Sequence, residues 1–492
     1  MPPFFRHTLL CLLLVSLLPA GEVWGQEPAR RPPERRQSDA PPDTVLQIDR
    51  DNTYLQQRAR DTLNQAQARR FYENVQAFCE RRKVTRWVFD VLFRSSAPPG
   101  EPVSPTPKPI DKFRTHEGKV IRRVTIRRLR TFGPSVNDTS RATERLLGKW
   151  GNRLHTDTRR WIIRGDMLVR EGDVFEPTRV RDTERLLRQA SYLLDARVIP
   201  VSTEHADSVD LLVITQDIWS ISADVGASPT DGSLTLRDRN LLGTANALSL
   251  QGRVHREFGW GYAARFDAPY LSRYLINARV ETLSDWDRSV HGFRIDRPFL
   301  TPSTRYAGNL SYYRRWEYAF LDLERDTVDV RRVVTAFDDA DAWFGRSFRL
   351  GFGDASFRER TRLVVAARRA QQHFRRRPEV RADTNQLFHN RATYLASVGF
   401  SERSYYRDVL VYGFGRTEDI PYGTSVVLTG GTERSEFSER PYLGGEVSSG
   451  RYHNHVGYVF WSVGAGSFFR KGRSEQGVLE VRTRYFSPLL HL

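Results

Sequence analysis

Residues 478–485 read Val-Leu-Glu-Val-Arg-Thr-Arg-Tyr, and from Leu479 onward uncharged and charged side chains alternate strictly. Successive side chains of an extended chain point to opposite sides, so the uncharged residues fall on one face and the charged residues on the other. The same alternation recurs at 247–254, 262–267 and 274–281. A period of two residues predicts β-strands that each have one apolar and one polar face.

About twelve such segments follow one another from Trp219 onward, separated by gaps of hairpin length. A water-soluble sandwich with one wet face would give the same alternation. Three features favour a membrane barrel instead. They are the number of segments, an export signal at the N-terminus, and aromatic residues near strand ends, such as Trp260, Tyr458 and Trp461. We therefore predict a mainly β fold, in which 218–492 form a transmembrane antiparallel β-barrel.

The N-terminus has the layout of a signal peptide. Arg6 and His7 precede an apolar run at 9–18, and Gly25 offers a cleavage site. The run is too short for a spanning helix, which needs about 20 apolar residues. We assign 1–25 to the signal peptide and 26–110 to a disordered leader, a helical extension and a proline-rich linker. Only Cys79 remains after cleavage, which leaves no internal disulfide.

The formal charge is +17 and comes almost entirely from arginine. A high charge is typical of nucleic-acid binding, but export and the even spread of arginine along the chain argue against a nucleic-acid partner. A charged barrel lumen or contact with an anionic surface explains the composition better.

Residues 111–217 have the pattern of a small α+β domain. The pattern predicts a strand at 120–129, a helix at 139–150, a short extended piece at 161–170, a helix that begins at Pro177, and strands at 196–201 and 209–216. The predicted order is strand–helix–helix–strand–strand.

Two groups of residues carry a resemblance to a known family. One part of the chain resembles a POTRA domain. The resemblance rests on the stretch Glu171-Gly172-Asp173-Val174-Phe175, the helix after it and residues 192–198. Residues 238–244, Asp-Arg-Asn-Leu-Leu-Gly-Thr, look like the opening of the barrel in the bacterial surface antigen superfamily of outer-membrane assembly and translocation factors, and 418–423 look typical of it too. The chain lacks that family's Arg-Gly-Phe/Tyr loop motif and its barrel-ending aromatic residue. Either the barrel is smaller than that of the family or the chain stops before the last strands, and we expect the second, a barrel that is incomplete at the C-terminus.

The resemblance implies an outer-membrane protein with its POTRA domain in the periplasm. It implies a protein that assembles or translocates polypeptides, with unfolded outer-membrane or exported polypeptides, outer-membrane lipid and accessory lipoproteins as partners. Clients would add to an exposed sheet edge. The predicted client edge comprises Ala196, Arg197, Val198, Ile199 and Val201. The predicted first strand of the barrel contains Trp219, Ile221, Ala223 and Val225, and it would pair with the last strand to close the seam. The predicted barrel-start motif contains Asp238, Asn240, Leu242 and Gly243.

The sequence offers no catalytic, cofactor-binding or metal site. His453 and His455 lack further ligands, and no phosphate loop, nucleophile elbow or zinc-protease helix occurs. An enzyme is thus the weakest interpretation. Transport of lipid or lipopolysaccharide through an arginine-lined lumen, and a passive porin, are the two alternatives to polypeptide handling.

Overall fold

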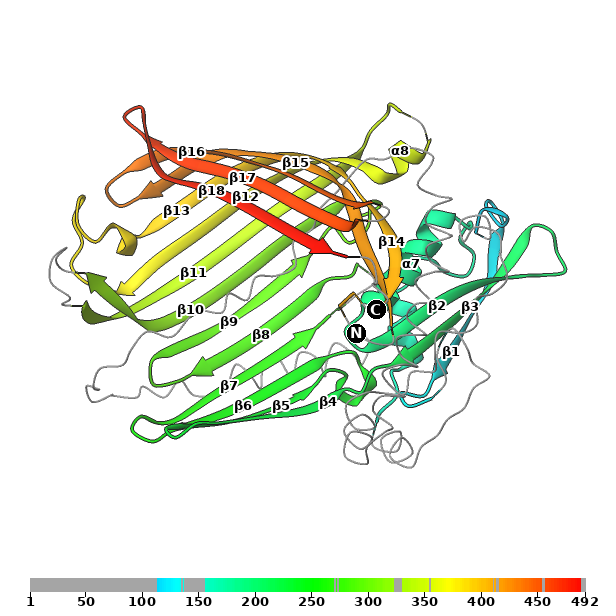
Figure 1. Cartoon of the computed structure of the whole chain (residues 1–492), viewed down its shortest axis with the longest axis horizontal. Coiled ribbons are helices and arrows are strands. Elements are labelled where there is room, and N and C mark those ends of the chain that lie inside the picture. Colours follow the sequence, from blue (N-terminus) through cyan, green and yellow to red (C-terminus); the bar gives the residue numbers. More distant parts are fainter. Residues whose placement is uncertain are drawn as a thin grey trace.

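The computed structural model describes residues 113–133, 136, 155–269, 271, 274–322, 330–353, 355–409, 411–412, 416–453 and 456–487. The described chain forms a small α+β part and a large curved sheet (Figure 1). Our predictions for 1–25, 26–110, the helix at 139–150 and His455 lie outside the described residues.

The described elements of the α+β part run strand–helix–helix–strand–strand, but their first helix is not the one predicted at 139–150, which lies outside the described residues. Its elements are β1 (Val120–Leu129), α6 (Arg160–Gly165), α7 (Pro177–Gln189), β2 (Leu193–Ser202) and β3 (Ser208–Asp217). The sheet order is β1-β3-β2, with β1 parallel and β2 antiparallel to β3. Pro177 begins α7 as predicted, because the first turn needs no donor from that position.

The prediction of an extended piece at 161–170 is wrong for its first half, which is helix α6. The local sequence Trp161-Ile162-Ile163 favours a strand by propensity. In the fold, one helical turn places Ile162 and Ile163 together in the core, and this packing overrides the local preference. The same core contains Tyr192 and Phe175, whose side chains are fully buried.

The large sheet of the described residues has fifteen strands, and all neighbours along it are antiparallel; all are consecutive in the chain except β13 and β15, between which β14 intervenes. Its order is β18-β17-β16-β15-β13-β12-β11-β10-β9-β8-β7-β6-β5-β4, and β14 pairs beside this path with the start of β15. The strands are β4 (Ile221–Ala227), β5 (Asp231–Asp238), β6 (Ala247–His255), β7 (Gly259–Ala268), β8 (Asn277–Ser284), β9 (Arg288–Arg297), β10 (Tyr306–Asp322), β11 (Val330–Arg349), β12 (Thr361–Arg376), β13 (Arg391–Glu402), β14 (Ser404–Val409), β15 (Thr417–Ser435), β16 (Glu439–His453), β17 (Gly457–Arg470) and β18 (Arg473–Phe486). Helix α8 (Ala355–Arg360) and the short turns η1 (Leu241–Gly243) and η2 (Gln386–Phe388) connect them.

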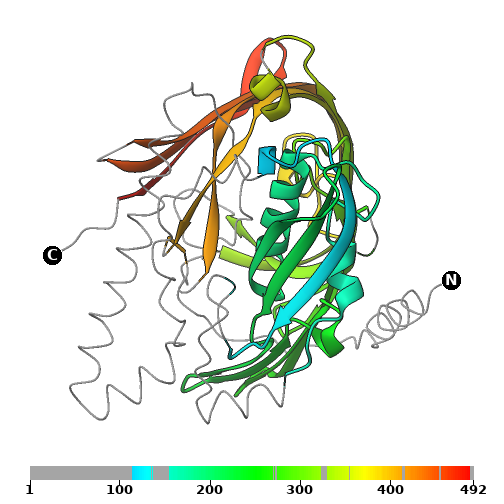
Figure 2. The same ribbon diagram turned by 90° about the vertical axis from the view of Figure 1, so that its right-hand side faces the viewer.

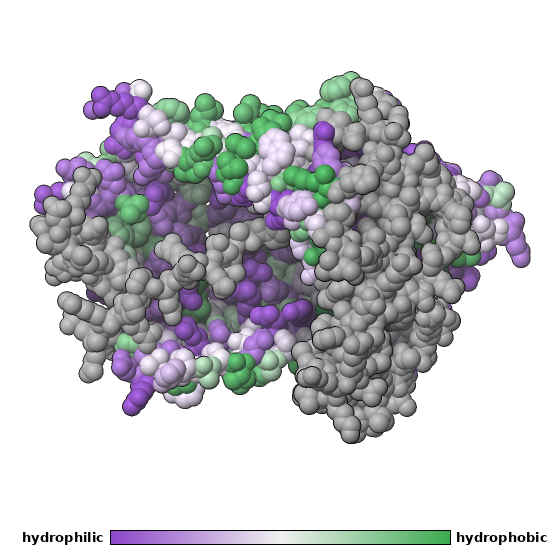
Figure 3. Space-filling model, viewed as in Figure 1, coloured by the Kyte–Doolittle hydropathy of each residue, from purple (hydrophilic) through white to green (hydrophobic). Residues whose placement is uncertain are grey.

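The two faces of the curved sheet differ in polarity, as the alternation predicts. On β15, Leu428 is 58% exposed on the face that it shares with Val398 of β13. The next residue, Thr429, lies on the other face and shares a hydrogen bond with Ser397. Figure 3 shows hydrophilic residues inside the hollow of the sheet and hydrophobic residues along its upper outer rim. The fold is therefore an antiparallel barrel with an apolar exterior and a polar lumen.

Several details of the predicted barrel need correction. The described residues form fifteen strands in this sheet, more than the twelve or so that the alternation indicated. Trp219 precedes β4 rather than lying in it, and its ring packs against Phe132 with centroids 5.7 Å apart. Tyr458, expected near the membrane interface, is buried in a cluster with Tyr406.

The predicted pairing of the first strand with the last does not form among the described residues. Strand β4 pairs only with β5, and β18 pairs only with β17. The barrel is therefore open along one side. No helix of the described residues is long and apolar enough to cross a membrane.

Candidate functional site

The two open edges of the barrel are the first component of the site. Strand β4 has seven residues and β18 has fourteen, and each exposes one row of backbone donors and acceptors. Val225 on β4 is 78% exposed and Leu479 on β18 is 72% exposed. Native proteins ordinarily cover or charge such an edge, because it is a template for pairing with another chain.

Charged side chains line the lumen between these edges, and arginines among them pair with carboxylates on neighbouring strands. Cross-strand ion pairs join Arg265 to Glu281 at 2.9 Å and Arg368 to Asp341 at 2.7 Å. Arg279 and Arg315 have carboxylate partners of the same kind. The lumen is thus hydrophilic without a single-sign cationic surface along these strands.

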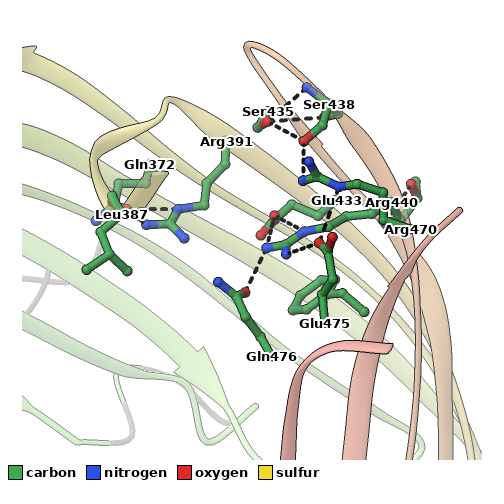
Figure 4. Close-up of polar contacts among 12 residues, drawn as sticks. Gln372, Leu387, Arg391, Glu433, Ser435, Ser438, Arg440, Arg470, Glu475 and Gln476 are labelled. Carbon is green, nitrogen blue, oxygen red and sulfur yellow. Dashed lines mark hydrogen bonds and ion pairs between the residues drawn. The ribbon is translucent and has the colours of Figure 1, made fainter. Parts of the chain in front are cut away.

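At the end of the barrel far from the α+β part, an ionic cluster fixes the last hairpins (Figure 4). The Arg440 guanidinium donates to Glu433 and to Gln476, at 2.8 Å each, and lies 3.2 Å from Glu475. The cavity beside it, lined among others by Arg391, measures about 20 Å³. A cavity of this size holds a water molecule rather than an organic ligand.

The α+β part is the second component, and it lies at the other end of the barrel (Figures 1 and 2). One attachment uses the predicted barrel-start motif. The motif lies between β5 and β6, so it follows the second strand of the barrel rather than opening the first. The buried Asn240 side chain donates to Thr158 Oγ1 and accepts from the backbone N–H of Ala245, both at 2.8 Å.

The backbone of the motif continues this attachment. Gly243 has a φ of 71°, and its carbonyl accepts a hydrogen bond from the N–H of Arg159. A Cβ atom at Gly243 would collide with the carbonyl oxygen of Asp157. Leu242 is exposed, and Asp238 accepts from the N–H of Asn240. Asn240 and Gly243 therefore join barrel and α+β part, whereas Leu242 contributes no buried contact.

A second attachment joins α7 to the hairpin of β14 and β15 through buried charges. The Arg188 side chain is 3% exposed and donates to both carboxylate oxygens of Asp419, at 2.7 and 2.8 Å. It also lies 2.8 Å from Glu184, which accepts from Arg407 at 2.7 Å. Next to them, Asp195 accepts from the N–H and hydroxyl of Thr417.

Burial shifts the pKa values of two charged groups on the α+β side of this attachment, Arg188 and Asp195. Burial lowers the pKa of Arg188, but the charges of Asp419 and Glu184 outweigh it and raise the pKa overall. Burial raises the pKa of Asp195 to about 6, against the opposing effect of Arg188. The Arg188 guanidinium therefore stays charged, whereas the Asp195 carboxylate is protonated more readily than a carboxylate in water.

The predicted client edge from Ala196 to Val201 lies on β2, which is an edge strand of the small sheet. Its start is occupied, because the backbone N–H of Ala196 donates to the Asp195 carboxylate and the Ala196 carbonyl accepts from Arg188. Pro200 lies in its second half, and proline cannot donate to an added strand. The geometry therefore offers a shorter free edge at β2 than at β18.

Sequence reasoning missed Arg188, Asp419 and Thr158. Arg188 follows Leu186 and Leu187 in a helix and has the i, i+4 spacing to Glu184 that is usual for a solvated pair. Asp419 lies inside the stretch 418–423 that carried the family resemblance, which was the only available signal.

Comparisons with known proteins give only distant structural matches. No protein-family model and no curated protein matches the sequence. Among solved structures, BamA from Haemophilus ducreyi lacking POTRA domains 1–3 is 10% identical over 75% of this chain and 85% of that chain, with a TM-score of 0.28. CdiB from Escherichia coli is 11% identical over 75% of this chain and 70% of that chain, with a TM-score of 0.31. OmpT, an outer membrane protein of Vibrio cholerae, is 7% identical over 54% of this chain and 96% of that chain, with a TM-score of 0.28. Similarity this low says nothing of what this chain binds.

Proposed function

We propose that this chain is an outer-membrane protein that assembles or translocates other polypeptides, and that it binds them by strand addition at β4 and β18. The observation that carries the proposal is that the large sheet ends in an unpaired strand on both sides among the described residues. An extended polypeptide adds to such an edge through main-chain hydrogen bonds, with little demand on its side chains.

The apolar exterior supports a place in the membrane. Outward residues such as Leu428, Leu443 and Val463 are exposed, and they lie on neighbouring strands. In hydrocarbon an unsatisfied backbone group costs several kcal/mol, so an open barrel edge is strongly driven to acquire a partner strand. A hydrophilic client segment can meanwhile pass along the polar lumen.

In this proposal the α+β part acts as a periplasmic POTRA-type domain. The chain passes from the end of β3 at Asp217 directly into β4 at Ile221, so this domain and one open edge are joined by a short link. A client held at the domain is thereby kept near β4. Accessory lipoproteins and outer-membrane lipid remain predicted partners, and no enzymatic step is part of the proposal.

Site-specific photocrosslinking tests the proposal. The full chain, expressed with its leader in a Gram-negative host, would carry a photoreactive residue at Ala223 on β4 or at Val481 on β18. Val398 on β13 is the matched control, because it also faces outward but lies in a strand paired on both sides. We expect both edge positions to form adducts with other exported polypeptides, and Val398 to form none.

Adducts confined to this chain itself, or the same adducts from all three positions, would refute strand addition of clients. Boiled and unboiled gel samples of each variant check that the barrel is folded, since a folded barrel migrates differently until it is heated.

The lumenal charges weigh against transport of lipid or lipopolysaccharide. Arginines such as Arg265 and Arg368 already contact carboxylates, which reduces their capacity to bind lipid phosphates. A passive porin would leave the α+β part at the barrel end without a role. Polypeptide handling uses both the open edges and this domain.

A further inference from the structure

Three potential metal ligands meet where the α+β part joins the barrel. His155, Asp157 and Asp217 each place a ligand atom so that all three atoms lie within 4.8 Å of one another. His155 and Asp157 lie just before α6, and Asp217 is the last residue of β3. The sequence separates them by about sixty residues, so no local ligand spacing reveals the group.

Burial makes this group unlike an ordinary surface cluster. The His155 side chain is 2% exposed and that of Asp217 is 3% exposed, whereas Asp157 is exposed. His155 Nε2 and Asp217 Oδ2 are 3.2 Å apart, and the same Oδ2 accepts the N–H of Thr158 at 2.6 Å.

Among the described residues, the other polar atom of each buried side chain has no hydrogen-bond partner. Asp217 Oδ1 and His155 Nδ1 are both buried without a hydrogen bond. A buried polar group without a hydrogen bond destabilises a fold. A simple His–Asp hydrogen bond therefore accounts for one atom of each residue and leaves the second atom of each unexplained.

We propose that His155, Asp157 and Asp217 form a binding site for a divalent transition-metal ion, with Zn²⁺ as the ion that fits best. One imidazole nitrogen and two carboxylate oxygens are a donor set that Zn²⁺ accepts at about 2.0–2.2 Å from the metal. The 3.2 Å between His155 Nε2 and Asp217 Oδ2 shows that the two side chains approach closely enough to share one ion. With Oδ2 held by the N–H of Thr158, the unpartnered Oδ1 of Asp217 is the carboxylate oxygen that would bind the metal. Asp157 is free to rotate onto the ion because it is exposed, and water completes the coordination.

The position gives the ion a structural role that is independent of the proposed function. The Asp157 carbonyl packs against Gly243, and the N–H of Arg159 donates to the Gly243 carbonyl. An ion held by Asp157 and Asp217 thus ties the end of the small sheet to the segment that contacts the barrel. It stiffens the junction at which the domain meets β4.

Zinc binding to the full chain, folded in detergent micelles and purified through a tag without histidine, tests the site. After removal of metal with a chelator, zinc bound per chain is measured at equilibrium. We expect one zinc ion per chain in the native protein and none at this site in His155→Ala or Asp217→Asn. His205→Ala is the control, because His205 is an exposed loop histidine of the same domain.

Asp157→Asn keeps the test decisive if a buried variant fails to fold, since its side chain is exposed. We expect its zinc affinity to fall about tenfold or more, because a lost ligand costs at least as much as a lost outer-shell partner. Hydrogen exchange of the segment that begins at His155 should also slow on adding zinc to the native chain, and not in Asp157→Asn. A native chain that takes up no zinc, or an Asp157→Asn or His155→Ala variant that binds it as well as the native chain does, would overturn the proposal.

Discussion

Replacement of Arg188 by methionine tests whether buried charges hold the α+β part on the barrel. Arg188 and Asp419 are both nearly inaccessible, at 3% and 5% side-chain exposure. Removing the guanidinium leaves Asp419 buried without this partner, while Glu184 keeps Arg407. Removing one partner of a buried ion pair costs about 3–5 kcal/mol, because the other charge stays desolvated. The docking of α7 on β14 and β15 should weaken by this amount.

Hydrogen exchange in the full chain measures the effect where it occurs. A loss of 3–5 kcal/mol corresponds to about 150-fold to several-thousand-fold more frequent opening, since each 1.4 kcal/mol is about a factor of ten. We expect this acceleration in peptides from α7 and β14, and little change in the mid-barrel strand β12.

Arg122→Met is the matched control, because it makes the same chemical change at an exposed ion pair. Arg122 lies 2.6 Å from Asp210, but its side chain is 48% exposed. Surface pairs of this kind contribute about 0–1 kcal/mol, so exchange near Arg122 should change by about fivefold at most. If Arg188→Met had no larger effect than Arg122→Met, the buried charges would not be what holds the domain. The double variant Arg188→Met with Asp419→Leu should recover part of the loss, because it removes the stranded carboxylate.

Three further predictions address the membrane face, the junction and the domain core. Leu428→Arg should destabilise the barrel by about 2–4 kcal/mol, measured by urea unfolding in lipid vesicles, because it places a charge on the outer face. Thr429→Arg, at the next residue, faces the lumen and should destabilise the barrel by less than half of that. Gly243→Ala should destabilise the junction by about 2 kcal/mol or more, seen as faster protease cleavage there, because of its φ of 71° and the collision with the Asp157 carbonyl. Burial raises the pKa of Asp166 from 3.8 to about 7. Between pH 3.8 and about pH 7 the domain therefore takes up a proton when it folds, and its stability falls as the pH rises through this range. Because the raised pKa of Asp195 acts in the same window, Asp166→Asn should reduce this dependence rather than abolish it in urea titrations at about pH 5 and about pH 8, with equal stability losses in both proteins as the refuting result.

Local periodicity was enough to predict most of the fold. Strand β1 has the predicted bounds, although a bulge between Ile121 and Arg123 interrupts the alternation of its buried side chains, and α7 begins at the predicted proline. Helix α6 was predicted wrongly because it is only six residues long. A single turn carries no helical period, and its isoleucines favour a strand until the rest of the core is present.

The site depends on contacts that no local pattern reveals. Arg188 and Asp419 are 231 residues apart in the sequence, and His155 is 62 residues from Asp217. The open edges are likewise a property of the whole sheet, since β18 has the same alternation as a strand that is paired on both sides. Sequence reasoning expected the first and last strands to pair, because closure is what removes edges from a barrel.

If clients bind by strand addition as proposed, the two attachments of the α+β part favour the free barrel edges over β2 as the acceptor. Buried ion pairs add little net stability, because the cost of desolvation offsets most of the Coulomb attraction. They do fix geometry: Arg188 binds both oxygens of Asp419 and Asp195 binds Thr417, so the domain sits in one orientation on the hairpin of β14 and β15. That orientation turns the start of β2 toward the barrel and occupies it. Strands β4 and β18 carry no such contact on their open sides within the described structure, and β18 offers the longer row of backbone groups. The charges that orient the domain therefore leave strand addition to the barrel edges.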